Sequence, residues 1–129
     1  MRKAALMILL VVLSNRAMAE WIAVDRDESE AAYADSATIR KAGTKVKMWV
    51  LYDFTTDQAT SYVVPYKSIR WHQEFDCKDE RARSLYHALH SGNMGGGDVI
   101  RTISSPSAWE PIAPGTRGGM LWKIACGKK

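Results

Sequence analysis

The sequence lacks any apolar run long enough to cross a membrane as a helix. Its longest run, Ala4 to Leu13, holds ten residues, whereas a spanning helix needs about 20. Two basic residues precede this run and Ala17-Met18-Ala19 follows it, which is the arrangement of a secretory signal peptide with its cleavage site. We therefore expect residues 1–19 to be a signal peptide and residues 20–129 to form one exported domain.

A cysteine that could carry a lipid anchor is also missing from the expected cut. Glu20 stands at that position, so we expect neither a lipid anchor nor a transmembrane segment. These features predict an exported protein of a Gram-negative-type bacterium, located in the periplasm, secreted or held at the cell surface.

An excess of one charge disappears when the expected signal peptide is set aside. The full sequence holds 18 Lys and Arg against 14 Asp and Glu, and three of the basic residues precede residue 20. Subtracting these three leaves 15 basic against 14 acidic residues, a net charge of +1. Proteins that bind nucleic acid carry clustered positive charge for the phosphates, so we expect no nucleic-acid partner.

Motifs of common catalytic and metal sites are absent. The sequence has no Gly-x-Ser-x-Gly or His-Glu-x-x-His, and the glycines at 95–97 lack the lysine of a phosphate loop. We therefore expect no enzymatic activity and no metal site. His87 and His90 could hold a metal or haem together on a helix, but in a strand residues three apart point to opposite faces.

Cysteine is scarce, with Cys77 and Cys126 as the only two. In an oxidising compartment an even pair most simply forms a disulfide. The chain-entropy model gives such a bridge about 4 kcal/mol of stabilisation.

Two segments alternate between apolar and polar residues, which is typical of half-buried strands. In Lys45–Phe54 one face is apolar or aromatic, and in Ser68–Cys77 the face that holds Cys77 is mostly apolar. Trp49 shares the other face of the first segment with lysines, where it could anchor a ligand or pack under a loop. We also expect strands at Trp21–Val24, Tyr33–Asp35 and Val99–Ile103, and turns at Ser36–Ile39 and Thr55–Ala59.

The C-terminal part favours one short helix. Thr116 suits its N-cap and the apolar stripe continues to Cys126, while two glycines in the first turn cost about 1 kcal/mol each. Asp79–His90 is ambiguous. It places Leu85 and Leu89 together on a helix, and its charged residues also alternate as in a strand.

Several separated motifs resemble those of the surface-adhesin protein E-like family. The residues that carry the resemblance are Trp21-Ile22-Ala23-Val24, Tyr33-Ala34-Asp35-Ser36-Ala37-Thr38-Ile39, Lys47-Met48-Trp49-Val50-Leu51, Phe75-Asp76-Cys77 and Trp109-Glu110-Pro111-Ile112-Ala113-Pro114-Gly115-Thr116. The resemblance implies an α+β fold, in which an antiparallel sheet of about six strands carries a short C-terminal helix on one face. It also implies that a Cys77–Cys126 disulfide ties helix to sheet and that Asp79–His90 is strand.

For function, the resemblance implies a non-catalytic binding module, since the family's named member binds host matrix proteins, binds haem and dimerises. We expect a protein ligand, either host matrix or a cell-envelope component, and an exposed edge strand would also permit a homodimer. The alternative is a periplasmic carrier of haem or another small molecule. The candidate ligand-binding residues are Trp49, Arg81, Arg83, His87 and His90. Arg81 and Arg83 would join Lys45 and Lys47 in a basic stripe if their strands are neighbours.

Overall fold

The computed structural model describes residues 19–60 and 63–128. The expected signal peptide, apart from Ala19, lies outside the described residues. The elements are, in chain order, β1 Ile22–Arg26, β2 Glu30–Ala42, β3 Lys45–Thr60, β4 Val63–Asp76, β5 Arg81–His90, the 3-10 turn η1 Asn93–Gly95, β6 Val99–Ile103, β7 Glu110–Pro111 and the helix α2 Arg117–Cys126.

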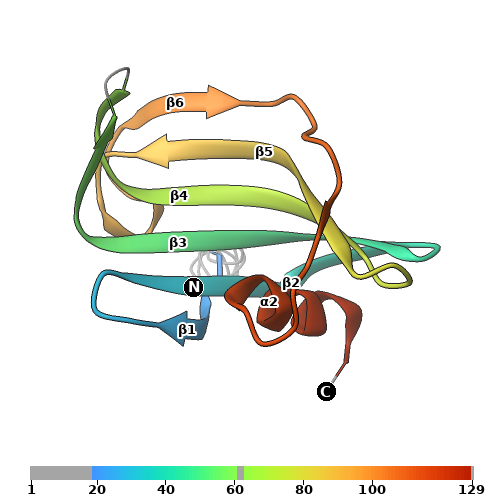
Figure 1. Ribbon diagram of the computed structural model, residues 1–129. Coiled ribbons are helices and arrows are strands. Elements are labelled where there is room, and N and C mark those ends of the chain that lie inside the picture. The colour runs from blue at the N-terminus through green and yellow to red at the C-terminus, as the bar shows by residue number, and fades with distance from the viewer. Residues whose placement is uncertain (1–18, 61–62, 129) are drawn as a thin grey trace, which may run out of the picture.

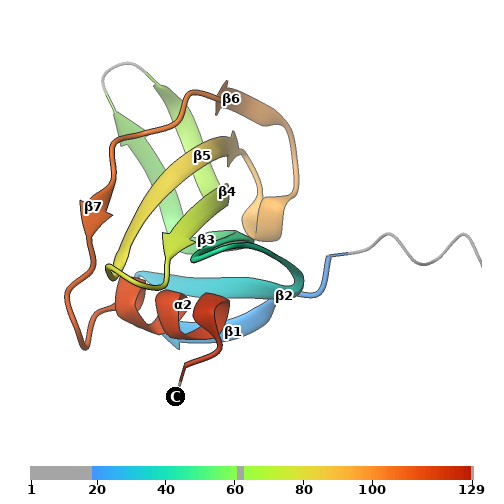
Figure 2. The same cartoon turned by 90° about the vertical axis from the view of Figure 1, so that its right-hand side faces the viewer.

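The strands form one antiparallel sheet in which β1 to β6 each pair with the next along the chain (Figure 1). The order is β1-β2-β3-β4-β5-β6. The short β7 pairs with the start of β5, and β6 pairs with the end of β5. β7 lies along the outer edge of the sheet, apart from α2 (Figure 2). The expected antiparallel sheet with one C-terminal helix is confirmed, and Asp79–His90 is strand from Arg81 onward.

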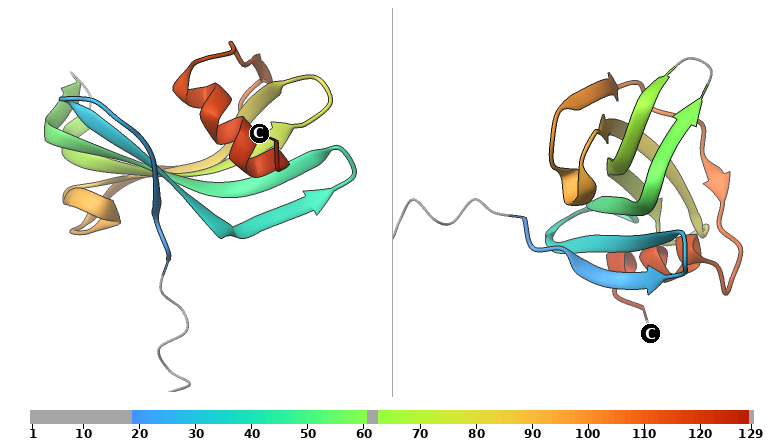
Figure 3. Two further views of the ribbon diagram at one scale, coloured as in Figure 1. Left: turned by 90° about the horizontal axis from the view of Figure 1, so that it is seen from below. Right: turned by 90° about the vertical axis from the view of Figure 1, so that its left-hand side faces the viewer.

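The sheet has two unlike faces, because side chains alternate along each strand. α2 packs against one of them, here the helix face, and η1 lies on the other, here the open face (Figure 3). The alternation predicted for Lys45–Phe54 is confirmed, since Val46, Met48 and Val50 are buried on the helix face. The buried core comprises Ala34, Val46, Met48, Val50, Phe75, Leu121, Trp122 and Ala125.

Several bonds hold the short helix to the sheet. The disulfide joins Cys77 to Cys126 with 5.7 Å between their Cα atoms, and the Trp122 indole donates to the backbone oxygen of Asp76 at 2.8 Å. Thr116 is the N-cap, as predicted, and its hydroxyl accepts from the Gly119 amide at 3.1 Å. These contacts compensate for the weak helix propensity of the first turn.

Arg117, the first residue of α2, binds the helix to the β1–β2 hairpin. Its guanidinium lies 3.2 Å from Asp25, 3.3 Å from Asp27 and 2.6 Å from Glu30. The pKa of Asp27 is lowered to about 2, mainly by hydrogen bonds from the backbone amides of Ser29 and Glu30. Asp25, Asp27 and Glu30 therefore tie the start of the helix to the hairpin.

Two of the turns expected from sequence are wrong. Ser36–Ile39 belongs to β2, where four residues lie opposite a single residue of β3 in a bulge. The Thr38 hydroxyl bridges this bulge, because it donates to the Asp35 carbonyl at 2.6 Å and accepts from the Trp49 amide at 3.0 Å. Thr55–Ala59 likewise continues β3, and Gln58 pairs with Tyr66 of β4.

Candidate functional site

The open face of the sheet carries rows of side chains contributed by three neighbouring strands. The register aligns Lys45 of β3, Asp76 of β4 and Arg81 of β5 in one row. The next row holds Lys47, Glu74 and Arg83. The two basic strands are not neighbours, so the condition for a continuous basic stripe is not met: β4 lies between them and supplies an acid to each row.

The acids of these rows are buried beneath the cations. Arg81 lies 2.9 Å from Asp76, Lys45 lies 3.9 Å from it, and Arg83 lies 2.8 Å from Glu74. The exposed fractions of the acidic side chains are 2% for Asp76 and 11% for Glu74, whereas Lys45, Arg81 and Arg83 keep 36%, 37% and 31%. The exposed part of these two rows is therefore mainly cationic.

The pKa of Asp76 shows that its pairing outweighs its burial. Burial alone would raise this pKa, but the hydrogen bond from Arg81, two backbone amides and the charge of Lys45 together lower it. Asp76 therefore stays ionised and fixes the cations around it.

Trp109 covers the same cations from outside the sheet. Its ring centroid lies 4.7 Å from the Arg83 guanidinium, 4.8 Å from that of Arg81 and 5.9 Å from the Lys45 ammonium. The segment that carries it is fastened along β5, where the Ser107 amide donates to the Ser84 carbonyl at 2.9 Å. Cations lie over an aromatic face because its quadrupole attracts them.

A third row of the open face is aromatic. Trp49 stacks on His72 with ring centroids 4.6 Å apart, and Tyr86 meets Trp49 edge-on at 5.7 Å. The guanidinium of Arg70 lies 5.0 Å from the centre of the Trp49 ring. Burial and the charge of Lys47 lower the pKa of His72. The row thus presents a half-buried aromatic platform beside the two charged rows.

These observations coincide with a match to a known family. A family model, described as surface-adhesin protein E, matches residues 21–127. The chain belongs to the surface-adhesin protein E family. No curated protein matches it.

Solved structures of Haemophilus influenzae protein E have the same fold. One covers 86% of this chain and 86% of its own, with a TM-score of 0.62 and 14% sequence identity. A second, crystal form II, covers 84% of this chain and 97% of its own, with a TM-score of 0.60 and 14% identity. In the described part of this family member, no helix is long and apolar enough to cross a membrane.

The structure of this protein E-family domain brings only part of the candidate residues together. Trp49, Arg81 and Arg83 share the open face. His87 lies on the helix face, 5.4 Å from the Trp71 ring, while His90 is buried on the open face with 4% exposure. Because the two histidines point to opposite faces, they do not form a paired ligand set. Among the described residues, no group of three or more His, Cys, Asp or Glu could hold a metal ion.

A bulge in β5 changes which of its side chains share a face. His72 pairs with Tyr86 and Gln73 with Ser84, so Leu85 is an extra residue in the ladder. The bulge places Tyr86 on the face of Arg81 and Arg83, whereas uninterrupted alternation would have placed it on the opposite face. Arg70, His72 and Trp109 were not among the predicted site residues, because their positions depend on pairing between distant segments.

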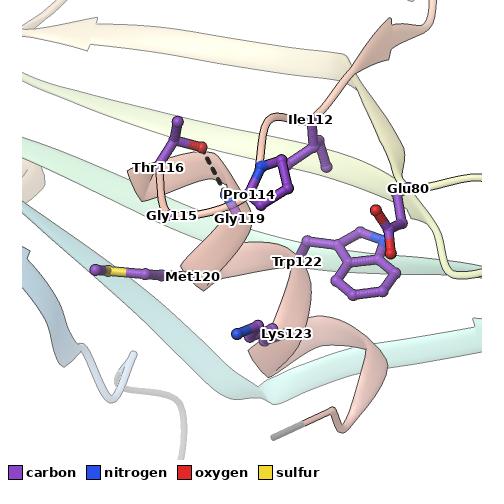
Figure 4. A pocket seen from close by; sticks show the side chains of 9 residues that line it. All are labelled: Glu80, Ile112, Pro114, Gly115, Thr116, Gly119, Met120, Trp122 and Lys123. Atoms are coloured by element: carbon purple, nitrogen blue, oxygen red, sulfur yellow. Dashed lines mark hydrogen bonds between the residues drawn. The ribbon is translucent and has the colours of Figure 1, made fainter.

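A separate cavity of about 220 Å³ lies between α2 and the segment that precedes it (Figure 4). Its wall is largely apolar, and the 41% exposed Met120 stands at one side of it. The residues that line it are Glu80, Ile112, Pro114, Gly115, Thr116, Gly119, Met120, Trp122 and Lys123. This cavity is on the helix side of the molecule and does not touch the cationic rows.

Proposed function

We propose that this protein E-family member is an exported, non-catalytic binding module whose open face docks an acidic segment of a protein ligand. The ligand would be a host matrix protein or a component of the cell envelope. The observation that carries the proposal is the unequal exposure of charge: the cations of the rows reach solvent while Asp76 and Glu74 lie beneath them. A surface of this kind attracts and orients an acidic partner.

The aromatic platform supports the same role. Trp and Arg are the residue types that most often dominate binding energy at protein interfaces. Trp49, His72 and Tyr86 are held by each other, so little side-chain freedom would be lost on docking. Asp35, the acid that pairs with Trp49 across β2 and β3, is 5% exposed and does not offset the cations at the surface.

Membership of the family and the disulfide support export, because such bridges persist in oxidising compartments. The location is tested by treating intact cells with protease and following the protein by mass spectrometry. Cleavage on intact cells would place it at the surface. Protection until the outer membrane is opened would move the proposed partner to the periplasm, and a reduced cytoplasmic form would contradict export.

Binding is tested with the protein from residue 20 onward over two immobilised probes, a host extracellular-matrix extract and an envelope fraction. Lys47→Glu reverses an exposed charge within the second row. We expect about tenfold weaker binding for it and a steeper loss for wild type as salt rises. Lys123→Glu, the same change at another exposed lysine, on α2, is the matched control and should bind as wild type does. Equal binding by all three proteins would contradict the proposal.

A further inference from the structure

Two cations of the open face lie on either side of its aromatic row. Lys47 belongs to the second row, before Trp49, and Arg70 belongs to the row after Trp49, where it pairs with Leu51 of β3. Lys47 is exposed and Arg70 is half-buried. Within the described part of the chain, neither of them forms an ion pair with an acid. Their charges are therefore available to a partner.

The second row holds more cations than acids. The register places Arg40 of β2 opposite Lys47, and Glu74 and Arg83 complete the row. Glu74 is bonded to Arg83 at 2.8 Å, whereas the Arg40 guanidinium donates to the Ile39 carbonyl at 2.9 Å. Three cations thus share a row with one acid, so the potential along it attracts an anion.

Arg70 brings the second available charge to the edge of the aromatic row. Its guanidinium lies 5.0 Å from the centre of the Trp49 ring, and that ring is itself held by stacking on His72. The other members of the Arg70 row carry no charge: Tyr33, Leu51, Ala88 and Thr102. A ligand at the aromatic row therefore meets a half-buried aromatic centre with an available cation on each side.

The spacing of these rows favours one conformation of the ligand. Adjacent rows are two residues apart along a strand, which is about 7 Å at the rise of an antiparallel strand. An extended peptide directs every second side chain to the same side and so has the same repeat. Three alternate side chains of such a segment can therefore face three successive rows. Because the cations flank the aromatic row, the order acidic, aromatic, acidic fits in either chain direction.

We propose that the open face binds an extended segment of a protein ligand in which an aromatic residue has acidic residues two positions before and two positions after it. The aromatic side chain would pack on Trp49 and Tyr86, and the carboxylates would bond to Lys47 and Arg70. Trp109 lies over the cations of the first row, which the segment need not reach. This inference rests on the proposed function and adds which acidic segments the face selects.

The test follows NMR signals of the isotope-labelled domain from residue 20 onward as capped peptides are added. The matched peptide has glutamates two positions before and after a phenylalanine, with serine and glycine elsewhere. Two peptides of the same composition place the glutamates directly beside the phenylalanine, or four positions from it as on one side of a helix. We expect the matched peptide to shift the Trp49 indole signal with saturation and to bind at least about fivefold more tightly than the other two.

Variants of the domain test the two cations separately. Lys47→Met and Arg70→Met each remove a charge but keep an unbranched side chain, and each should weaken the matched peptide about fivefold or more. Arg70→Lys keeps the charge and should bind within about twofold of wild type. Arg101→Met, which removes an exposed cation from β6 on the helix face, is the matched control and should bind as wild type does. Thermal unfolding establishes that each variant is folded.

The outcomes separate this inference from the proposed function. Equal binding of all three peptides, each weakened by Lys47→Met, would overturn the spacing and leave an acidic partner in place. Tightest binding of the peptide with four-residue spacing would indicate a helical ligand and overturn the extended one. A dimer in solution that Lys47→Met dissociates and the matched peptide does not would make a second copy the occupant. No binding of any peptide would overturn the inference alone if the matrix or envelope probe still binds through Lys47, and the proposed function as well if neither probe binds.

Discussion

The helix face and the open face are built from the same strands but hold opposite kinds of side chain. On β3, Val46, Met48 and Val50 are buried against α2, whereas the intervening Lys45, Lys47 and Trp49 belong to the charged and aromatic rows. One face therefore supplies most of the apolar burial that stabilises the fold, and the other supplies groups that a partner can reach. Alternation along a strand thus places groups that stabilise the fold and groups that a partner can reach at neighbouring positions.

The largest effect is expected from emptying the core on the helix face. Phe75 is 1% exposed and belongs to the cluster that α2 covers. Phe75→Ala should lower the free energy of unfolding by about 3–5 kcal/mol, through lost burial and the cavity left behind. Urea unfolding measures this change. A loss below 1 kcal/mol, on the same core-packing scale, would break the assignment of stability to the helix face.

Removing the disulfide should have the next largest effect. Cys77→Ser together with Cys126→Ser releases a bridge between residues 49 positions apart, and the expected loss is about 2–4 kcal/mol. Thermal unfolding compares this variant with the oxidised and the chemically reduced wild type. The reduced wild type should match the double variant, and an unchanged midpoint in both would contradict a stabilising role for the bridge.

Acid should destabilise the domain through its histidines, on both faces. The pKa values of His72, His87 and His90 are all lowered from 6.5 in the folded protein, mainly by burial. The unfolded chain therefore takes up protons first, so stability falls as the pH drops below 6.5 until each lowered pKa is passed. Each histidine contributes a slope of up to about 1.4 kcal/mol per pH unit.

The measurement is the free energy of unfolding between pH 8 and pH 5, a range around the ordinary histidine pKa. His90→Gln should flatten the curve, because His90 is the most buried of the three by its 4% exposure. A stability that rises on acidification through this range would contradict the lowered pKa values.

The smallest effect on stability is expected at Trp109 on the open face. Its ring is half-buried and contacts three cations, and an exposed cation–π contact is worth about 0.5–1 kcal/mol. Trp109→Ala should therefore cost about 1 kcal/mol by urea unfolding. Trp109→Leu, which keeps apolar bulk without the aromatic ring, should lose a similar amount. Full stability in the leucine variant would show that packing alone holds this residue.

The sequence predicted the elements whose signals are local. The alternation in Lys45–Phe54 and the position of Cys77 identified the helix face correctly, and Thr116 marked the helix start. The register between strands could not be predicted in the same way, because a bulge changes which side chains share a face. The bulge at Leu85 and the Thr38 bridge in β2 depend on contacts with other strands, so no local pattern reveals them.

The candidate surface was predicted less completely than the fold. Trp49, Arg81 and Arg83 were predicted as candidates because an aromatic and two cations occur at positions that could share a strand face. Trp109 reaches the same surface from a segment that follows β6, and the acids of β4 interleave with the cations only in the folded sheet. Long-range pairing of this kind is what a single sequence shows least.

The most direct test of the separation between faces measures stability and binding together in two variants. Trp49→Ala combined with Lys47→Glu alters the open face, and Phe75→Leu alters the helix face. We expect the first to weaken binding to the matrix or envelope probe by tenfold or more, on the scale of an interface anchor, with a smaller loss of stability than the second. Phe75→Leu should lower the free energy of unfolding and leave the affinity of the folded protein unchanged. Parallel losses of stability and affinity in both variants, or unchanged affinity in the open-face variant, would contradict the account.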